Sequence, residues 1–390
     1  MKKKIGLYIK IRPEGGGTYQ YNLSMVEALN SLPSKNFDKV IVYIYDPWKS
    51  HFPGDRAPAI KVNLGLLGRA FGMAWQILGL PIELLRKFSP AVYPVTRAML
   101  SQNCHLWIFP SQDSFYTIPV PALGTIHDLM HHYAREFPEF SSRGKYRRKE
   151  MHYKRICDWG KGVIVDSSIG KQQVMECYGV KPQKIHILPF VPPEYIQEKT
   201  HLKLTSSIDG LPKKFFFYPA QFWKHKNHIL LVKAFGRLKE KLPDLKMVFS
   251  GSEKNAYRET RDAVHQLGLA NDVFFLGFVP NNMMPELYKR ARGLIMPTFA
   301  GPTNIPPLEA NVLGCPVAIS NIYGMPDQLG DAALYFDPSS IEEIAKSMER
   351  LWKDEELCAD LRKKGLDRAK LWTQQHFNEK FVSIIRSNIE

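Results

Sequence analysis

The sequence predicts an α/β protein made of two similar domains, each built on a doubly wound parallel β-sheet. Three observations lead to this prediction. At 390 residues the chain is longer than one hydrophobic core usually organises, so two domains are favoured. Short apolar runs rich in β-forming residues alternate with longer segments able to form helices. These runs are continuously apolar, as in parallel strands that are covered on both faces.

The expected strands form two series, separated by a polar stretch at 192–212 that is rich in Pro, Ser and Thr. The first series lies at 4–10, 40–46, 105–110, 122–128, 162–167 and 185–190. The second lies at 215–220, 247–251, 273–278, 293–298, 316–320 and 333–337. The expected domains are residues 1–195 and 205–371, and a helix over about 372–390 is expected to pack back on the first. Since open α/β sheets bind ligands at the carboxyl ends of their strands, we expect a central cleft between the domains.

The composition is that of a soluble globular protein, with 44% hydrophobic and 23% charged residues, and it excludes a disordered or collagen-like chain. The five cysteines are scattered without C-x-x-C spacing, which argues against a disulfide framework and favours the cytoplasm. The start MKKKIGLYIK is basic, but its apolar stretch is too short for a signal peptide. No uninterrupted apolar run reaches the length of a membrane span.

The net charge is +15, and residues 1–200 carry most of it, with 27 Lys/Arg against 16 Asp/Glu. A positive field of this kind favours an anionic partner: nucleotide phosphates, a phospholipid surface or nucleic acid. The segment Leu64–Leu85 has two interpretations. It forms a pair of buried helices, or it dips into a bilayer with Arg69, Arg86 and Lys87 at the lipid head groups.

Two segments of the first half follow expected strands. In EGGGTYQYNLSMVEAL (14–29), Gly16 and Gly17 let backbone N–H groups approach an anion at a helix start, although a plain tight turn is the alternative. In TIHDLMHHYAREF (125–137), His127 is placed to exchange protons, and Asp128 is placed to orient it. A metal site at His127, His131 and His132 is disfavoured because no nearby acid or Cys completes the set, so we expect no metal.

Two segments of the second half have the same strand, turn and helix order. YPAQFWKHKNHILLVKAF (218–235) places lysines beside a helix start, where they suit phosphate, although a solvated basic loop is equally consistent. In FAGPTNIPPLEA (299–310) three prolines restrict the backbone, so the remaining N–H groups can be held in one geometry. Glu309 follows within the helix start, where it can also serve only to favour the positive end of the helix.

Taken in order, these four segments resemble the retaining, nucleotide-sugar-dependent glycosyltransferases of family 4, which have the GT-B fold of two Rossmann-like domains. The most specific part is PPLEANVLGCPVAISNIYGMPDQLGDAALYFDP (306–338), similar to the family's nucleotide-site helix and the strand after it. VFFLGFVPNNMMPELYKRARGLIMPT (273–298) is similar to the segment that holds the nucleobase through backbone groups. The resemblance covers nearly the whole chain.

The resemblance implies a role for each matching position. Gly16, Gly17 and Lys226 would face the diphosphate, and Glu309 would bind the ribose hydroxyls. His127 would lie beside the donor sugar and the acceptor. The expected catalytic residues are His127, Thr303 and Asn304. The expected nucleotide-sugar site comprises Gly16, Gly17, Gln221, Lys224, Lys226, Asn227, Val279, Gly301, Thr303, Asn304, Ile305 and Glu309.

The chain departs from the family pattern at two positions. Gly301 stands where the family usually has the first of two glutamates, and Gln221 stands where it usually has an arginine. We expect Thr303 and Asn304 to contact the donor sugar instead, and Lys224 to replace the arginine's charge. This GPTN variant still resembles a subset of the family.

The resemblance implies transfer of a hexose-type sugar, with retention, from a nucleotide diphosphate sugar to a saccharide or lipid-linked glycan in bacterial surface polysaccharide synthesis. Mannose is the sugar we favour, with no cofactor. The sequence contains no D-x-D triplet, which favours metal-independent chemistry. A cytoplasmic enzyme bound peripherally to the inner face of the membrane is expected, because the first half is basic.

Two other classes remain open at this stage. A nucleic-acid-binding protein is suggested by the charge and by SSRGKYRRKEMHYKR (141–155), although no nucleic-acid-binding motif is present and no such partner is expected. Another GT-B enzyme, such as a sugar-nucleotide epimerase or a phosphorylase, is the second. No recognisable pyridoxal phosphate lysine motif supports a phosphorylase.

Overall fold

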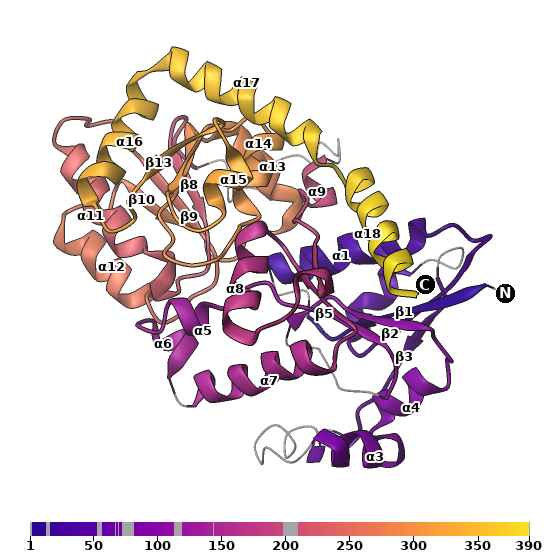
Figure 1. The fold of residues 1–390 in the computed structure, drawn as a ribbon. Coiled ribbons are helices and arrows are strands. Elements are labelled where there is room, and N and C mark those ends of the chain that lie inside the picture. The colour runs from indigo at the N-terminus through magenta and orange to yellow at the C-terminus, as the bar shows by residue number, and fades with distance from the viewer. Residues whose placement is uncertain are drawn as a thin grey trace. The chain divides into compact units, whose positions relative to one another are not determined.

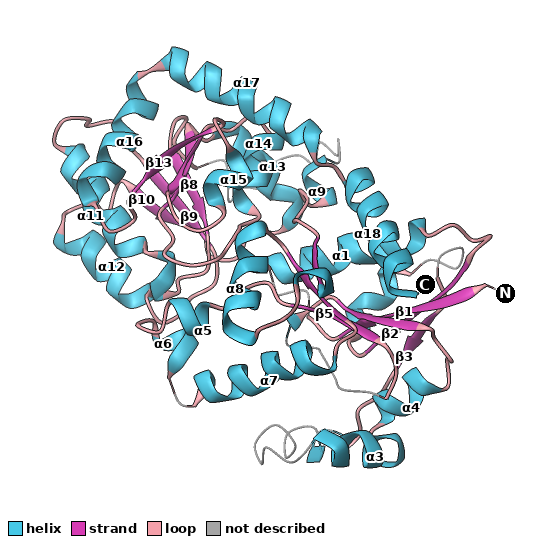
Figure 2. Ribbon diagram, in the orientation of Figure 1, coloured by secondary structure: helices cyan, strands magenta, loops and turns pink. Residues whose placement is uncertain are grey.

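The chain folds into two compact α/β units in the computed structural model (Figures 1 and 2). Unit 1 comprises Met1–Tyr133, Ser141–Val191 and Gln374–Glu390, and unit 2 comprises Ala134–Phe140 and Pro192–Thr373. The structure describes residues 2–12, 16–52, 57–66, 68, 70–71, 82–112, 119–142, 144–197 and 210–389.

Unit 1 is built on a seven-stranded parallel sheet in the order β3-β2-β1-β4-β5-β6-β7. Its strands are β1 (Lys3–Ile9), β2 (Phe37–Tyr43), β3 (Ala59–Lys61), β4 (Leu106–Phe109), β5 (Ala122–Thr125), β6 (Gly162–Val165) and β7 (Ile185–Ile187). All four residues of β4, β5 and β6 are buried, so the central strands are covered on both faces, as their continuous apolar sequences predict.

Helices connect the parallel strands of unit 1, and α18 packs against α1. These helices are α1 (Gly17–Ser31), η2 (Asp46–His51), α3 (Ile82–Val92), α4 (Pro94–Leu100), α5 (Met130–Tyr133), α7 (Lys145–Trp159), α8 (Ser168–Tyr178), η4 (Pro182–Lys184) and α18 (Gln374–Ile389). The short helix α6 (Pro138–Ser141) lies in unit 2 except for its last residue. Phe377 and Phe381 of α18 are fully buried, which explains the apolar period of the C-terminal segment.

Unit 2 has a six-stranded parallel sheet in the order β10-β9-β8-β11-β12-β13. Its strands are β8 (Phe216–Pro219), β9 (Met247–Ser250), β10 (Val273–Phe275), β11 (Gly293–Met296), β12 (Val317–Ser320) and β13 (Ala333–Phe336). Its helices are α9 (Glu194–Gln197), η5 (Lys224–Lys226), α11 (His228–Lys239), α12 (Tyr257–Gln266), η6 (Asn281–Met283), α13 (Met284–Arg290), α14 (Pro306–Val312), α15 (Met325–Leu329), α16 (Ile341–Lys353) and α17 (Glu355–Leu371).

The prediction of two doubly wound parallel-sheet domains is confirmed. Every predicted strand is present, and most end a few residues before the predicted end. The sequence analysis missed β3, a three-residue edge strand whose side chains are exposed or half-buried, because such a strand has no apolar run to mark it.

The unit boundaries differ from the predicted ones at Ala134–Phe140, which belongs to unit 2 and lies inside the predicted first domain. Its aromatic residues pack on unit 2 side chains: the Phe137 ring stacks 5.6 Å from Phe299, and Phe140 lies 4.8 Å from His225. Nothing in the local sequence marks this exchange, because it depends on residues far along the chain.

Within the described ranges, no helix combines the length and the apolar character needed to cross a membrane. The predicted bilayer segment Leu64–Leu85 lies largely outside the described residues, since 67, 69 and 72–81 are among those left out.

Candidate functional site

The strand order of unit 2 reverses between β8 and β11, and the loops that follow these two strands carry most of the predicted site. At such a reversal the loops separate to opposite faces of the sheet, which leaves a ligand site at the carboxyl ends of the strands. The two loops are joined here: the backbone N–H of Phe299 and the hydroxyl of Thr298 both donate to the carbonyl of His225, at 2.8 and 3.2 Å.

Lys226 and Asn304 meet across this switch point. The Lys226 ammonium donates to Oδ1 of Asn304 at 3.3 Å. Gln328 of α15 holds the Asn304 backbone in both directions, accepting from its N–H at 3.1 Å and donating to its carbonyl at 2.8 Å. The Asn304 side chain is buried, and within the described structure its Nδ2 has no hydrogen-bond partner. A buried amide that keeps a donor unsatisfied is a candidate for contact with a polar ligand.

Gly301 has φ of +104°, a conformation that side-chain-bearing residues rarely adopt. A Cβ added at this position would lie 3.1 Å from Nδ2 and 3.3 Å from Oδ1 of Asn304. The Asn304 amide thus occupies the space next to residue 301. A side chain at 301 would be strained at this φ, and the Asn304 amide would have to move by a few tenths of an ångström to accommodate it.

Glu309 lies in the first turn of α14 and is 4% exposed. Tyr195 of α9 donates its hydroxyl to Oε1, and Tyr288 of α13 donates to Oε2 at 2.5 Å. Burial raises the pKa of Glu309, and the two tyrosine hydrogen bonds oppose that shift only in part. The carboxyl group is therefore held in a fixed position, with each oxygen already accepting one hydrogen bond.

Glu139, in the segment Ala134–Phe140, braces the loop that carries Lys226. Its Oε1 accepts from the backbone N–H of His225 at 2.9 Å and pairs with the His225 Nδ1 at 2.6 Å. Its Oε2 accepts from Asn255, whose own Oδ1 accepts from the backbone of Lys224. Burial alone raises the pKa of Glu139, but these hydrogen bonds outweigh it and lower the pKa to about 2.

The remaining predicted residues of the β8 loop have structural contacts of their own. Both amide hydrogens of Asn227 go to backbone carbonyls, of Pro297 at 2.9 Å and Pro338 at 2.7 Å. Its side chain therefore fixes the loop and has no hydrogen left for a ligand. Gln221 accepts from the Trp223 indole at 2.9 Å, and the exposed Lys224 ammonium lies 3.6 Å from Glu259.

The other predicted residues of unit 2 flank this arrangement. Thr303 lies half-buried beside Asn304, and Ile305 is the buried residue that precedes α14 and whose carbonyl accepts from the Glu309 N–H at 3.1 Å. Val279 follows β10 and packs against the unit 2 core. Its neighbour Phe278 is 72% exposed, an aromatic surface beside the predicted nucleobase segment that the sequence analysis did not single out.

In unit 1 the strand order reverses between β1 and β4. Gly16, with φ of +58°, directly precedes α1, and Gly17 is the first residue of that helix. The N-cap residue Gly16 has no side chain with which to cap the helix, whose first N–H groups have no partner within the helix itself. Asn22 of α1 donates to Ser111, which follows β4, at 2.8 Å, so the two sides of the switch point are tied together.

His127 follows β5 and is buried among aromatic rings, with Tyr21 at 4.8 Å and Phe190 at 5.5 Å. Its Nε2 lies 3.1 Å from the carbonyl of Pro110. Because a carbonyl only accepts, Nε2 of His127 is the donor in this contact. The carboxylate of Asp128 accepts from the Met130 backbone and from Gln112, and its orienting role toward His127 stays a prediction.

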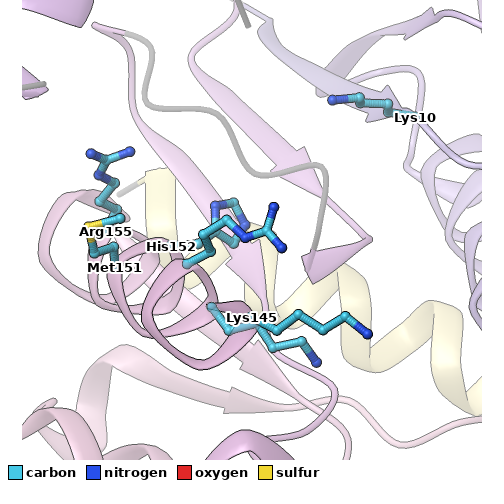
Figure 3. Close-up of a pocket in the computed structure, with 7 residues that line it drawn as sticks. Lys10, Lys145, Met151, His152 and Arg155 are labelled. Carbon is cyan, nitrogen blue, oxygen red and sulfur yellow. The ribbon is translucent and has the colours of Figure 1, made fainter. Parts of the chain in front are cut away.

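A basic pocket lies between α7 and the end of β1 in unit 1 (Figure 3). Its volume is about 430 Å³. Figure 3 shows Lys145, Met151, His152 and Arg155 on one helix and Lys10 on a separate segment. The lining residues are Lys10, Lys145, Arg148, Lys149, Met151, His152 and Arg155, and none of them is acidic. The pocket therefore presents a concentrated positive field.

Comparison with known proteins identifies the part of the chain that holds the Lys226–Asn304 contact. Residues 207–368 match the family model described as Glycosyl transferases group 1. These residues, called the group 1 domain below, are similar to that family. The group 1 domain contains both loops of the unit 2 switch point, together with Glu309, so the predicted nucleotide-sugar residues of the second half all lie inside it.

Individual relatives extend the match over both units. Mannosylfructose-phosphate synthase of Agrobacterium fabrum is 24% identical over 303 residues, which cover 70% of this chain and 65% of that protein. O-antigen chain mannosyltransferase RfbU of Salmonella typhimurium is 23% identical over 357 residues, covering 88% of this chain and 90% of that protein. Together with the group 1 domain, these relatives support a transferase.

The solved structure of Anabaena Alr3699/HepE, in complex with UDP and glucose, has the same fold. Its TM-score is 0.73 at 16% identity, and the match covers 99% of this chain and 100% of that one. The predicted fold class, GT-B with two Rossmann-like domains, is confirmed.

Proposed function

We propose that this chain is a retaining glycosyltransferase of family 4 that transfers mannose from a nucleotide diphosphate donor to a glycan or lipid-linked acceptor. The observation that carries the proposal is the Lys226–Asn304 contact at the switch point of the group 1 domain. The names of both curated relatives specify mannosyl transfer, and RfbU acts on an O-antigen chain. Synthesis of a bacterial surface polysaccharide is the process we infer.

In this proposal the group 1 domain binds the donor. Lys226 neutralises the diphosphate as it departs, with support from the Gly16–Gly17 helix start, and charge stabilisation of this kind is usually the largest catalytic term. Glu309 contacts the ribose, backbone groups near Val279 hold the base, and Thr303 and Asn304 contact the sugar.

The chemistry we propose is a front-face reaction without metal or cofactor, in which the leaving phosphate helps to deprotonate the acceptor. Retention through a covalent intermediate would require two carboxylates that flank the sugar. At the position where the family usually has an acid beside the sugar, this chain has Gly301. His127 lies beside the sugar in this scheme. An inverted product anomer, identified by NMR, would rule the mechanism out.

On the acceptor side we propose that the basic pocket of unit 1 binds a phosphate group of a lipid-linked acceptor at the inner face of the cytoplasmic membrane. The cations of α7 and Lys10 supply the charge for such a group. This use also accounts for the basic segment 141–155 without nucleic acid, because much of it is the helix that lines the pocket.

Donor identity can be tested by thermal shift with UDP-, GDP-, ADP-, CMP- and dTDP-sugars. We expect GDP-mannose to raise the unfolding midpoint most, because a ligand at 100 times its Kd adds about 2.7 kcal/mol to the stability of the folded state. A response to UDP-glucose alone would overturn the choice of mannose. The absence of a response to every sugar nucleotide would overturn the transferase proposal itself.

Replacing Asn304 with alanine tests its role at the donor sugar. We expect about a tenfold lower kcat/KM for the donor, since one hydrogen bond to a polar ligand and one partner of Lys226 are lost. Asn271→Ala, at an exposed position in the same unit, is the control and should keep wild-type kinetics. Unchanged donor KM and kcat in Asn304→Ala would remove Asn304 from the site.

A further inference from the structure

Four polar side chains from three helices converge on one point in unit 1. They are His131 and His132 of α5, Glu150 of α7 and Tyr178 at the end of α8. Oε2 of Glu150 lies 3.2 Å from Nε2 of His131, 2.6 Å from Nε2 of His132 and 3.2 Å from the Tyr178 hydroxyl. The Tyr178 hydroxyl also lies 3.3 Å from Nε2 of His131.

Hydrogen bonding within this cluster leaves one buried nitrogen without a partner. Three donors are directed at a single carboxylate oxygen, which offers only two lone pairs. Tyr178 and His131 both face Oε2 of Glu150, and they also contact each other. In that second contact one of the two groups must accept the hydrogen bond that the other donates. Within the described structure, the second nitrogen of His131 is buried without a hydrogen-bond partner. A buried imidazole nitrogen without a partner, beside a carboxylate and a second imidazole, is the feature that hydrogen bonding leaves unexplained.

The spacing matches that of ligands around a small cation. Zinc bound to His and carboxylate ligands at about 2.0–2.2 Å in a tetrahedron places its ligand atoms about 3.3 Å apart. The 3.2 Å between Nε2 of His131 and Oε2 of Glu150 agrees with this value, and the three ligand atoms all lie within 4.8 Å of one another. The 2.6 Å contact between His132 and Glu150 has to open, by a small side-chain rotation.

We propose that His131, His132 and Glu150 bind a Zn²⁺ ion, with the fourth position beside the Tyr178 hydroxyl. Imidazole nitrogens with one carboxylate form a ligand set that suits zinc. The His131 side chain is fully buried, whereas His132 is 17% and Glu150 31% exposed. The site thus has a rigid interior ligand and an open side through which an ion enters.

The sequence analysis disfavoured a metal because no acid stands near the histidines, and that reason is wrong in the folded chain. Glu150 is 18 residues from His132 in sequence, and α7 brings it into contact. The ion would link α5 to α7. Of these two helices, α5 directly follows the segment that carries His127. The role of the ion is structural, since His127 takes no part in the cluster, and sugar transfer remains independent of metal.

Zinc binding can be tested on the full chain after dialysis against a chelator. We expect one equivalent of Zn²⁺ in competition with a chromogenic chelator, and at least tenfold weaker binding in His132→Ala and Glu150→Gln. His265→Ala removes an exposed histidine of unit 2 and should bind as the wild type does. Because an ion that binds only the folded state stabilises it, Zn²⁺ should raise the unfolding midpoint of the wild type and of His265→Ala alone.

A measurement on the unaltered protein keeps the proposal falsifiable if the variants fold poorly. Co²⁺ added to the stripped wild type should give the intense visible absorption of a four- or five-coordinate ion. A weak spectrum like that of aqueous Co²⁺ would overturn the proposal, as would equal Zn²⁺ affinity in the wild type and in both ligand variants. Neither outcome bears on donor binding, so the proposed transferase is tested separately.

Discussion

Lys226→Ala is expected to lower kcat/KM for the donor by about 10²–10³-fold, the usual cost of removing one preorganised donor at a site of developing charge. The ammonium is held at the switch point by Asn304, in a loop braced by Glu139 and Asn255. The charge is therefore already in position when the diphosphate departs. Steady-state kinetics with the donor identified by thermal shift will measure the effect.

Two further variants show whether the loss reflects the ammonium itself. Lys233→Ala removes an exposed lysine of α11 and should leave kcat/KM unchanged. Lys226→Arg keeps the charge with a different shape and should recover part of the activity. Activity of Lys226→Ala within threefold of the wild type would show that the diphosphate is bound elsewhere.

Glu309→Ala is expected to reduce the free energy of unfolding by about 2–4 kcal/mol, because it leaves two tyrosine hydroxyls without their acceptor. Tyr288 is fully buried, so its hydroxyl has no access to water in compensation. Urea denaturation of the wild type and the variant will measure the difference. Donor affinity should fall as well if the carboxyl contacts the ribose.

A double variant separates the lost hydrogen bonds from the lost volume. In Glu309→Ala the Tyr288 hydroxyl is an unsatisfied buried group, and Tyr288→Phe removes it. The double variant should therefore be less destabilised than the sum of the two single variants. Additive effects would mean that the hydroxyl contributes nothing through Glu309.

Because the pKa of Glu309 is raised in the folded state, its contribution to the free energy of unfolding depends on pH. The folded state holds the proton more tightly than the unfolded state, so this group's contribution is greatest below the unfolded pKa. It is lost as the pH rises from there through the folded pKa. Glu309→Gln, which has no proton to lose, should remove this part of the pH dependence.

The strands were predictable because continuous apolar runs mark parallel strands wherever both faces are covered, as in FFFYPA around β8. The predicted ends were too late because the loop residues after several strands are also apolar or buried, as at Leu188 and Thr298. Edge strand β3 lies outside this rule, since it is half-exposed.

The residues of the candidate site were predictable where polar side chains lie in the loop that follows a strand. Lys226 and Asn304 were both identified from strand, turn and helix order, and the structure places them in contact. The groups that support the site were missed because they come from distant parts of the chain. Glu139 holds the Lys226 loop, and Tyr195 and Tyr288 hold Glu309.

By itself, the sequence determined the two parallel sheets and the loops at their carboxyl ends, because strand burial and turn chemistry are local properties of the chain. Only the tertiary structure decided what those loops hold. It showed that Gly301 and Asn304 share one space, and that Glu150 meets two histidines. Hydrogen bonds and steric exclusion act over a few ångströms in space, and sequence separation carries no information about such contacts.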